Sequence, residues 1–120
     1  MIWIHLFASR SEKNRQKENF VAQLEFAVFL DKPLMIHCRP YGKTMDAHED
    51  MLHILSEKRT SHGGRLRGNV HFFTGTIDIA KRYFDLGFTL SFPGVITFAP
   101  EYDPLVLECP IDMVLSETDA

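Results

Sequence analysis

The chain has 120 residues, enough for one domain with its own core, and a formal net charge of −3. This charge excludes a global basic field that would draw the protein to nucleic acid, so any phosphate contact must be local. No apolar run approaches the roughly 20 residues of a membrane span, and Cys38 and Cys109 lack metal-type spacing. We therefore expect one compact cytoplasmic domain with reduced thiols and no membrane contact.

The apolar pattern switches repeatedly between strand-like runs and helical periodicity. Strands are predicted at residues 1–8, 33–39, 69–73, 88–92 and 111–118. Helices are predicted between them, at residues 11–30, 46–58, 77–86 and 102–108. Ser11 is expected to cap the first helix, and Gly87 is expected to end the third.

Alternation of this kind predicts parallel strands joined by right-handed crossovers. A complete eight-stranded barrel needs about 250 residues, and this chain has roughly half that length. The fold class we expect is α/β, a partial (β/α) TIM-type barrel with about five parallel strands alternating with helices. Residues 1–120 would form this single partial domain; a small open α/β sheet is the other architecture that the pattern allows.

Three predicted strands carry a metal-competent residue toward their carboxyl ends: His37, His71 and Asp119. Parallel strands place these ends on one face, so the three side chains could converge on a divalent zinc, manganese or magnesium ion. A single histidine at a strand end is more often packed or solvated than a ligand. The repetition of the pattern on several strands favours a metal site.

The two-residue period of a strand predicts the direction of these side chains. In the second strand, His37 should face away from the helices, opposite to Ile36 and Cys38. In the third strand, His71 and Phe73 should face one way, and Val70 and Phe72 the other.

Four motifs occur in a fixed order along the chain: IHCR at 36–39, VHFFTG at 70–75, LSFPGVITF at 90–98 and LSETD at 115–119. Together they resemble the TatD-type deoxyribonucleases, metal-dependent hydrolases with a TIM-barrel fold. The segment 16–30 also resembles the helix that precedes the first motif in that family. The resemblance covers about residues 10 to 120.

The resemblance implies a site and a reaction. His37 and His71 would be imidazole ligands of a metal, and Asp119 would bind metal and help to orient or deprotonate the attacking water. The cofactors would be divalent ions (Mg, Mn or Zn), two in the complete family site, and the substrate would be DNA or another phosphodiester. Arg39 could pair with a substrate phosphate, although a structural ion pair suits it equally well.

The sequence also departs from the family pattern. The family has a His-x-His pair on its first strand and a metal-bridging glutamate on a later one, but residues 1–7 contain no acid. The motif HCRDA is interrupted by residues 40–45, and the chain ends one residue after Asp119. We therefore expect a truncated form that lacks the N-terminal strands and the C-terminal part of the barrel. A non-catalytic remnant, or a hydrolase of another ester or amide, remain the alternatives.

Other charged residues are assigned to the remainder of the surface. Four cations, Lys58, Arg59, Arg65 and Arg67, come just before the third strand, hence on the face opposite the predicted site. A solvated turn is a better interpretation of them than a DNA-binding patch. His48 and His53 are expected at the surface or in helix packing.

Overall fold

The computed structural model describes residues 2–7, 13–40 and 44–118, the first of these ranges by its backbone alone. In chain order its strands and helices are β1 (Ile2–Phe7), α1 (Lys13–Phe29), β2 (Leu34–Arg39), α2 (Asp46–His62), β3 (Gly68–His71), α3 (Ile77–Asp85), β4 (Phe88–Pro93), α4 (Asp103–Glu108) and β5 (Val114–Glu117). No helix among the described residues combines the length and the apolar character needed to cross a membrane.

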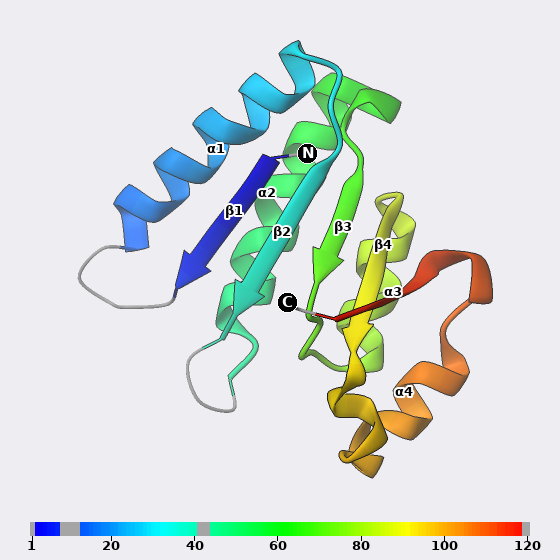
Figure 1. The fold of residues 1–120 in the computed structure, drawn as a ribbon. Coiled ribbons are helices and arrows are strands. Elements are labelled where there is room, and N and C mark those ends of the chain that lie inside the picture. The colour runs from blue at the N-terminus through cyan, green and yellow to red at the C-terminus, as the bar shows by residue number, and fades with distance from the viewer. Residues whose placement is uncertain (1, 8–12, 41–43, 119–120) are drawn as a thin grey trace.

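The strands form one sheet in the order β1-β2-β3-β4-β5, and each neighbouring pair is parallel. In Figure 1, α2 and α3 lie behind β2, β3 and β4, while the near face of these strands remains in view. The expected alternation of parallel strands with helices is confirmed. Because all strands run the same way, their carboxyl ends share one edge of the sheet.

Several predicted boundaries shift by a few residues. The second helix continues to His62, and the last strand begins only at Val114 because residues 111–113 form a 3-10 turn. Gly87 ends the third helix as predicted: it has φ 78° and its N–H donates to the carbonyl of Phe84 at 2.8 Å. The predicted cap at Ser11 lies outside the described residues.

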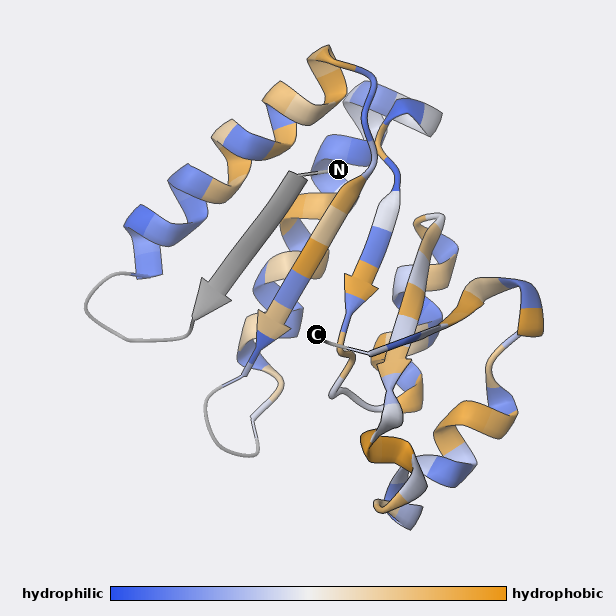
Figure 2. Cartoon of the chain, in the orientation of Figure 1, coloured by the Kyte–Doolittle hydropathy of each residue, from blue (hydrophilic) through white to orange (hydrophobic). Residues whose placement is uncertain are grey.

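The helix-side face of the sheet forms the core. In β2, Leu34, Ile36 and Cys38 are buried, His37 is half-buried and Arg39 is exposed, so the predicted alternation is confirmed in this strand. Figure 2 shows that α1 begins with hydrophilic residues and becomes more hydrophobic toward its C-terminal half. Its buried residues are Phe20, Leu24, Ala27 and Val28. Burial of such apolar surface is the main source of stability for the sheet and its helices.

The predicted alternation is wrong at the end of β3. The strand stops at His71, and Phe72 adopts a left-handed backbone with φ 49°. This turn places the Phe72 ring beside His71, with ring centroids 6.4 Å apart, and sends Phe73 into the core against Tyr83 at 6.1 Å. A positive φ is usually signalled by a glycine, and the sequence has none at this position. The two-residue period therefore predicted a strand that ends at residue 73, two residues beyond the observed end at His71.

The four cations before β3 have structural roles on the amino-terminal side of the sheet. The guanidinium of Arg59 donates to the carbonyls of Leu66 and Leu86, at 2.8 and 3.1 Å. Arg65 donates to a carbonyl of α1, and Arg67 pairs with Asp31 at 2.9 Å. The amine of Lys58 pairs with Glu25 at 2.8 Å. Together these contacts tie helix ends to the turn.

Large apolar side chains are exposed in two regions. The first is the end of α1 and the residue after it, with Phe26, Phe29 and Leu30. The second is the C-terminal quarter, where Val95, Phe98, Leu107, Ile111 and Leu115 are exposed; in Figure 2 the turn after β4 and parts of α4 are strongly hydrophobic.

One polar group is fully enclosed on the helix side. His48 of α2 is 0% exposed, and its Nδ1 lies 2.9 Å from the hydroxyl of Tyr83 in α3. Burial lowers the pKa of His48 to about 4. The same environment raises the pKa of the neighbouring Cys38 thiol to about 12, so this cysteine is an inert core residue.

His48 should make the protein sensitive to acid. Since its folded pKa of about 4 lies below the unfolded value of about 6.5, the unfolded chain binds the extra proton between these pH values. Its contribution is complete above pH 6.5, and we expect a loss of about 3 kcal/mol in the free energy of unfolding as the pH falls to 4. Urea unfolding across this range should show the loss in the wild type and in His53→Gln, whose side chain is exposed, but a smaller loss in His48→Gln. If the free energy of unfolding falls equally with pH in His48→Gln and His53→Gln, His48 is not the group that causes the loss.

Gly68 begins β3 and pairs with Leu34, the first residue of β2. A Cβ atom there would be 2.3 Å from the carbonyl oxygen of Leu34, a backbone atom that cannot move aside cheaply. We expect Gly68→Ala to lower the free energy of unfolding by about 2 kcal/mol, because the two strands must separate. Gly64→Ala is the matched control, since a Cβ at Gly64 has no atom within 4 Å. Chemical denaturation of both variants measures the difference, and equal stabilities would show that the strands have slack.

Candidate functional site

The predicted histidines lie side by side at the carboxyl ends of adjacent strands. The register of β2 and β3 pairs His37 with His71, and their ring centroids are 6.0 Å apart with an interplanar angle of 50°. His71 is 5% exposed, whereas His37 is half-buried. The structure therefore brings together two of the three proposed metal ligands. The third, Asp119, lies outside the described residues.

The Phe72 ring packs against both imidazoles, with centroid distances of 6.5 Å to His37 and 6.4 Å to His71. Its edge-on contacts follow directly from the left-handed backbone of the residue, which keeps the ring on the face of the histidines. The apolar ring excludes water from one side of the pair. A partly dry site strengthens any electrostatic interaction made there.

The carboxylate of Glu117 makes three of the polar contacts that the structure describes in this region. One oxygen contacts Nδ1 of His71. The other accepts hydrogen bonds from the backbone N–H of Phe72 at 2.7 Å and from the hydroxyl of Ser91 at 2.9 Å. The Glu117 side chain is 12% exposed, so these donors stabilise a nearly buried carboxylate. The carboxylate in turn sets the orientation of the His71 ring.

Sequence reasoning missed Glu117. The motif LSETD drew attention to Asp119 alone, although both acids stand in the same short segment. The signal that could have found it is the two-residue period: Glu117 and Asp119 are two positions apart, so an extended chain points both toward one face. The sequence does not show that Glu117 of β5 contacts His71 of β3, although β4 lies between these two strands.

A chain of hydrogen bonds continues from Glu117 along the same face of the sheet. The Ser91 hydroxyl is 2.9 Å from both Glu117 and Asn69 Oδ1, and its single hydrogen serves one acceptor at a time. Asn69 Nδ2 then donates to the hydroxyl of Thr89 at 2.9 Å. Three neighbouring strands thus contribute to one polar network, and such satisfied networks hold buried side chains in a single arrangement.

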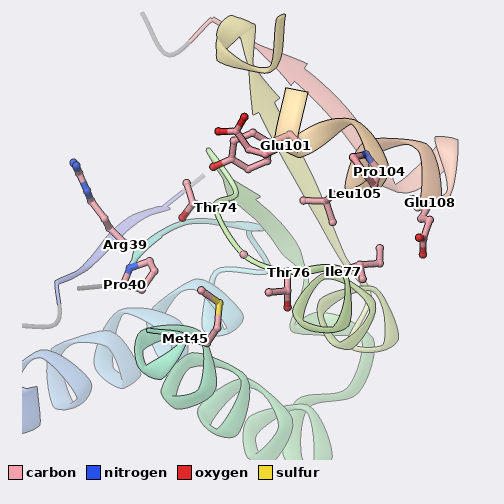
Figure 3. Close-up of a pocket in the computed structure, with 12 residues that line it drawn as sticks. Arg39, Pro40, Met45, Thr74, Thr76, Ile77, Glu101, Pro104, Leu105 and Glu108 are labelled. Carbon is pink, nitrogen blue, oxygen red and sulfur yellow. The ribbon is translucent and has the colours of Figure 1, made fainter. Parts of the chain in front are cut away.

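Two adjoining cavities open at the carboxyl edge of the sheet. The smaller, of about 200 Å³, is lined by His37, Cys38, Arg39, Phe72 and Thr74. The larger, of about 640 Å³, shares Arg39 and Thr74 with it and extends toward α4. Figure 3 shows this larger cavity, with Arg39 and Pro40 on one side and Glu101 and Leu105 on the other. His37 is therefore accessible from the smaller cavity, whereas His71 is 5% exposed and lines neither cavity. The larger cavity has the size of a small-molecule site.

The arrangement suits a metal centre whose ligands come from several strands. Imidazole nitrogen is a common ligand of zinc, manganese and related ions, and a ligating histidine commonly gives its other nitrogen to a carboxylate. His71 with Glu117 has this second relationship. Among the residues the structure describes, no group of three His, Cys, Asp or Glu side chains is placed to hold a metal ion.

Half a parallel (β/α) barrel with polar side chains at its carboxyl edge defines the class of protein, a portion of a TIM-barrel enzyme domain. The comparisons agree. The model of the TatD-related DNase family matches residues 5–120. The chain therefore belongs to the TatD-related DNase family.

Relatives in the family show both the similarity and its extent. The Escherichia coli protein named uncharacterized metal-dependent hydrolase YcfH is 36% identical over 110 residues, which cover 90% of this chain and 38% of that protein. The Bacillus subtilis metal-dependent hydrolase YabD is 38% identical over 112 residues, covering 92% of this chain and 40% of YabD. The human 3'-5' RNA nuclease TATDN2 is 31% identical over 88% of this chain and 13% of its own length. The chain thus spans about two fifths of the bacterial relatives.

A solved structure supports the fold assignment. The crystal structure of YjjV, a TatD homologue from E. coli, aligns with a TM-score of 0.79 and 25% sequence identity, covering 100% of this chain and 43% of YjjV. The expected partial TIM-type barrel is therefore confirmed, and the alternative of an unrelated small open sheet is not needed.

Removing the Glu117 carboxylate should leave the Phe72 N–H without its acceptor, whereas the Ser91 hydroxyl can still donate to Asn69. We expect Glu117→Ala to lower the free energy of unfolding by about 2–3 kcal/mol and to speed hydrogen exchange at the Phe72 amide. Glu108→Ala is the matched control, because Glu108 is 57% exposed and only approaches Lys81 at 3.7 Å; its effect should stay below about 0.5 kcal/mol. Denaturation and amide exchange measure both effects, and an unchanged Phe72 amide would exclude the carboxylate as its acceptor.

Proposed function

We propose that this chain provides part of the active centre of a metal-dependent phosphodiesterase, with His37, His71 and Asp119 as metal ligands and DNA as the substrate. The observation that carries the proposal is the pairing of His37 with His71 at the carboxyl edge of a parallel sheet. The contact of the Glu117 carboxylate with Nδ1 of His71 supports it. Family membership supports the metal-dependent class, and the name of TATDN2 supports a nucleic-acid substrate.

The residues present fit a divalent ion. Two imidazoles on adjacent strands offer nitrogen ligands, and the Glu117 carboxylate supplies the outer partner that fixes the His71 ring. A bound Mg, Mn or Zn ion would lower the pKa of a coordinated water and offset charge on the phosphoryl oxygens. We assign this role to one or two ions, two being the number in the complete family site.

The chain's own side chains would perform the remaining tasks. Glu117 positions His71 and does not itself touch substrate. Asp119 would accept or orient the proton of the attacking water. The exposed Arg39 lines both cavities and would pair with a phosphate oxygen through its planar guanidinium. The free cysteines support a cytoplasmic location, where thiols stay reduced.

Metal binding tests the proposed ligands directly. Titration of Mn²⁺ into the full chain, followed by calorimetry, should show binding in the wild type and a loss of at least tenfold in affinity, about 1.4 kcal/mol, for His37→Ala, His71→Ala and Asp119→Ala. His53→Ala, on the exposed side of α2, is the control and should bind as the wild type does. If His37→Ala and His53→Ala bind equally well, the proposed site is wrong.

Turnover separates the remaining alternatives. We expect Mg²⁺ or Mn²⁺ to promote cleavage of a DNA oligonucleotide more than hydrolysis of a small carboxylic ester. Preference for the ester would favour a hydrolase of another substrate. Metal binding without any turnover would favour a non-catalytic remnant.

A further inference from the structure

The larger cavity has the size and the mostly apolar lining of a site for a small organic group. Its volume of about 640 Å³ lies within the usual range of small-molecule sites, about 300–1,000 Å³. Most of its lining is apolar, and the residues that contribute this surface are Pro40, Met45, Ile77, Tyr102, Pro104 and Leu105. The tyrosine gives this lining an aromatic group on which a ring can stack.

The charged groups around this cavity are separated. Arg39, on one side, also lines the cavity of His37, so positive charge lies where the two cavities meet. Glu101 and Glu108 lie on the opposite side, as Figure 3 shows. A phosphate is attracted to the first side and repelled from the second. The far side therefore suits an uncharged group, and carboxylates there can accept hydrogen bonds from amino groups on a ring.

We propose that the larger cavity binds the nucleobase of a nucleotide whose phosphate lies toward Arg39 and His37. This inference rests on the proposed phosphodiesterase function and names the part of the substrate that the cleft recognises. Thr74 lines both cavities, so the sugar would pass this residue on its way from phosphate to base. Tyr102 would stack on the base, an interaction that is sequence-tolerant because every base has an aromatic face.

Binding of small probes in EDTA tests this proposal without metal or turnover. Deoxyadenosine 5'-monophosphate should bind the full chain about tenfold more tightly than 2-deoxyribose 5-phosphate, because only the former carries a base. Tyr102→Ala should remove most of this difference, whereas Tyr102→Phe should retain it. Leu107→Ala is the control, since Leu107 lies on α4, directly after the turn that holds Tyr102, is 84% exposed and does not line the cavity.

Chemical-shift mapping in the wild type gives a second test that needs no variant. Deoxyadenosine should shift the amides of Gly75, Ile77 and Leu105, which line the cavity, and should leave those of Val21 and Ile54, in a separate apolar hollow, unchanged. Equal affinity for the two phosphates, or shifts only in the separate hollow, would overturn the proposal.

The two proposals can fail separately. Mn²⁺ binding that depends on His37, combined with no preference for the base-bearing probe, would leave the phosphodiesterase standing and remove the nucleobase cavity. Base-dependent binding in EDTA, combined with no metal binding, would support the nucleobase cavity and remove the metal-dependent phosphodiesterase.

Discussion

The carboxylate of Glu117 connects the last strand of the sheet to its centre. It accepts hydrogen bonds from the backbone N–H of Phe72 and from the hydroxyl of Ser91, and it contacts Nδ1 of His71. These three residues lie in β3, in β4 or directly after β3. Without such an acceptor the left-handed turn at Phe72 would leave a buried N–H unsatisfied, which is costly. The position of His71, the direction of the Phe72 ring and the packing of β5 therefore depend on one another through a single side chain.

Sequence reasoning captured the repetitive parts of the structure. Local patterns predicted three features that the structure confirms. These are the alternation of strands and helices, the direction of His37 away from the helices, and the end of α3 at Gly87. The pairing of His37 with His71 also followed, because parallel strands place equivalent ends together. These features are set by period and by turn chemistry, which a single sequence carries.

The features that the sequence did not reveal depend on contacts between distant residues. Phe72 adopts a positive φ without being glycine, a conformation held by Glu117, 45 positions later in the chain. Glu117 gained its role only from this contact across β4. The cleft beside Arg39 is assembled from three separate stretches of chain, so no local pattern could announce it.

The close approach of Gly68 to Leu34 has a consequence at the other end of the strands. This contact fixes the relative height of β2 and β3, and the same register sets His37 opposite His71 three residues further on. A slip of one residue would offset the two imidazoles by about 3.3 Å and turn one of them to the helix side. The distance between the two imidazole rings at the carboxyl end is thus set by backbone packing at the amino end of the same two strands.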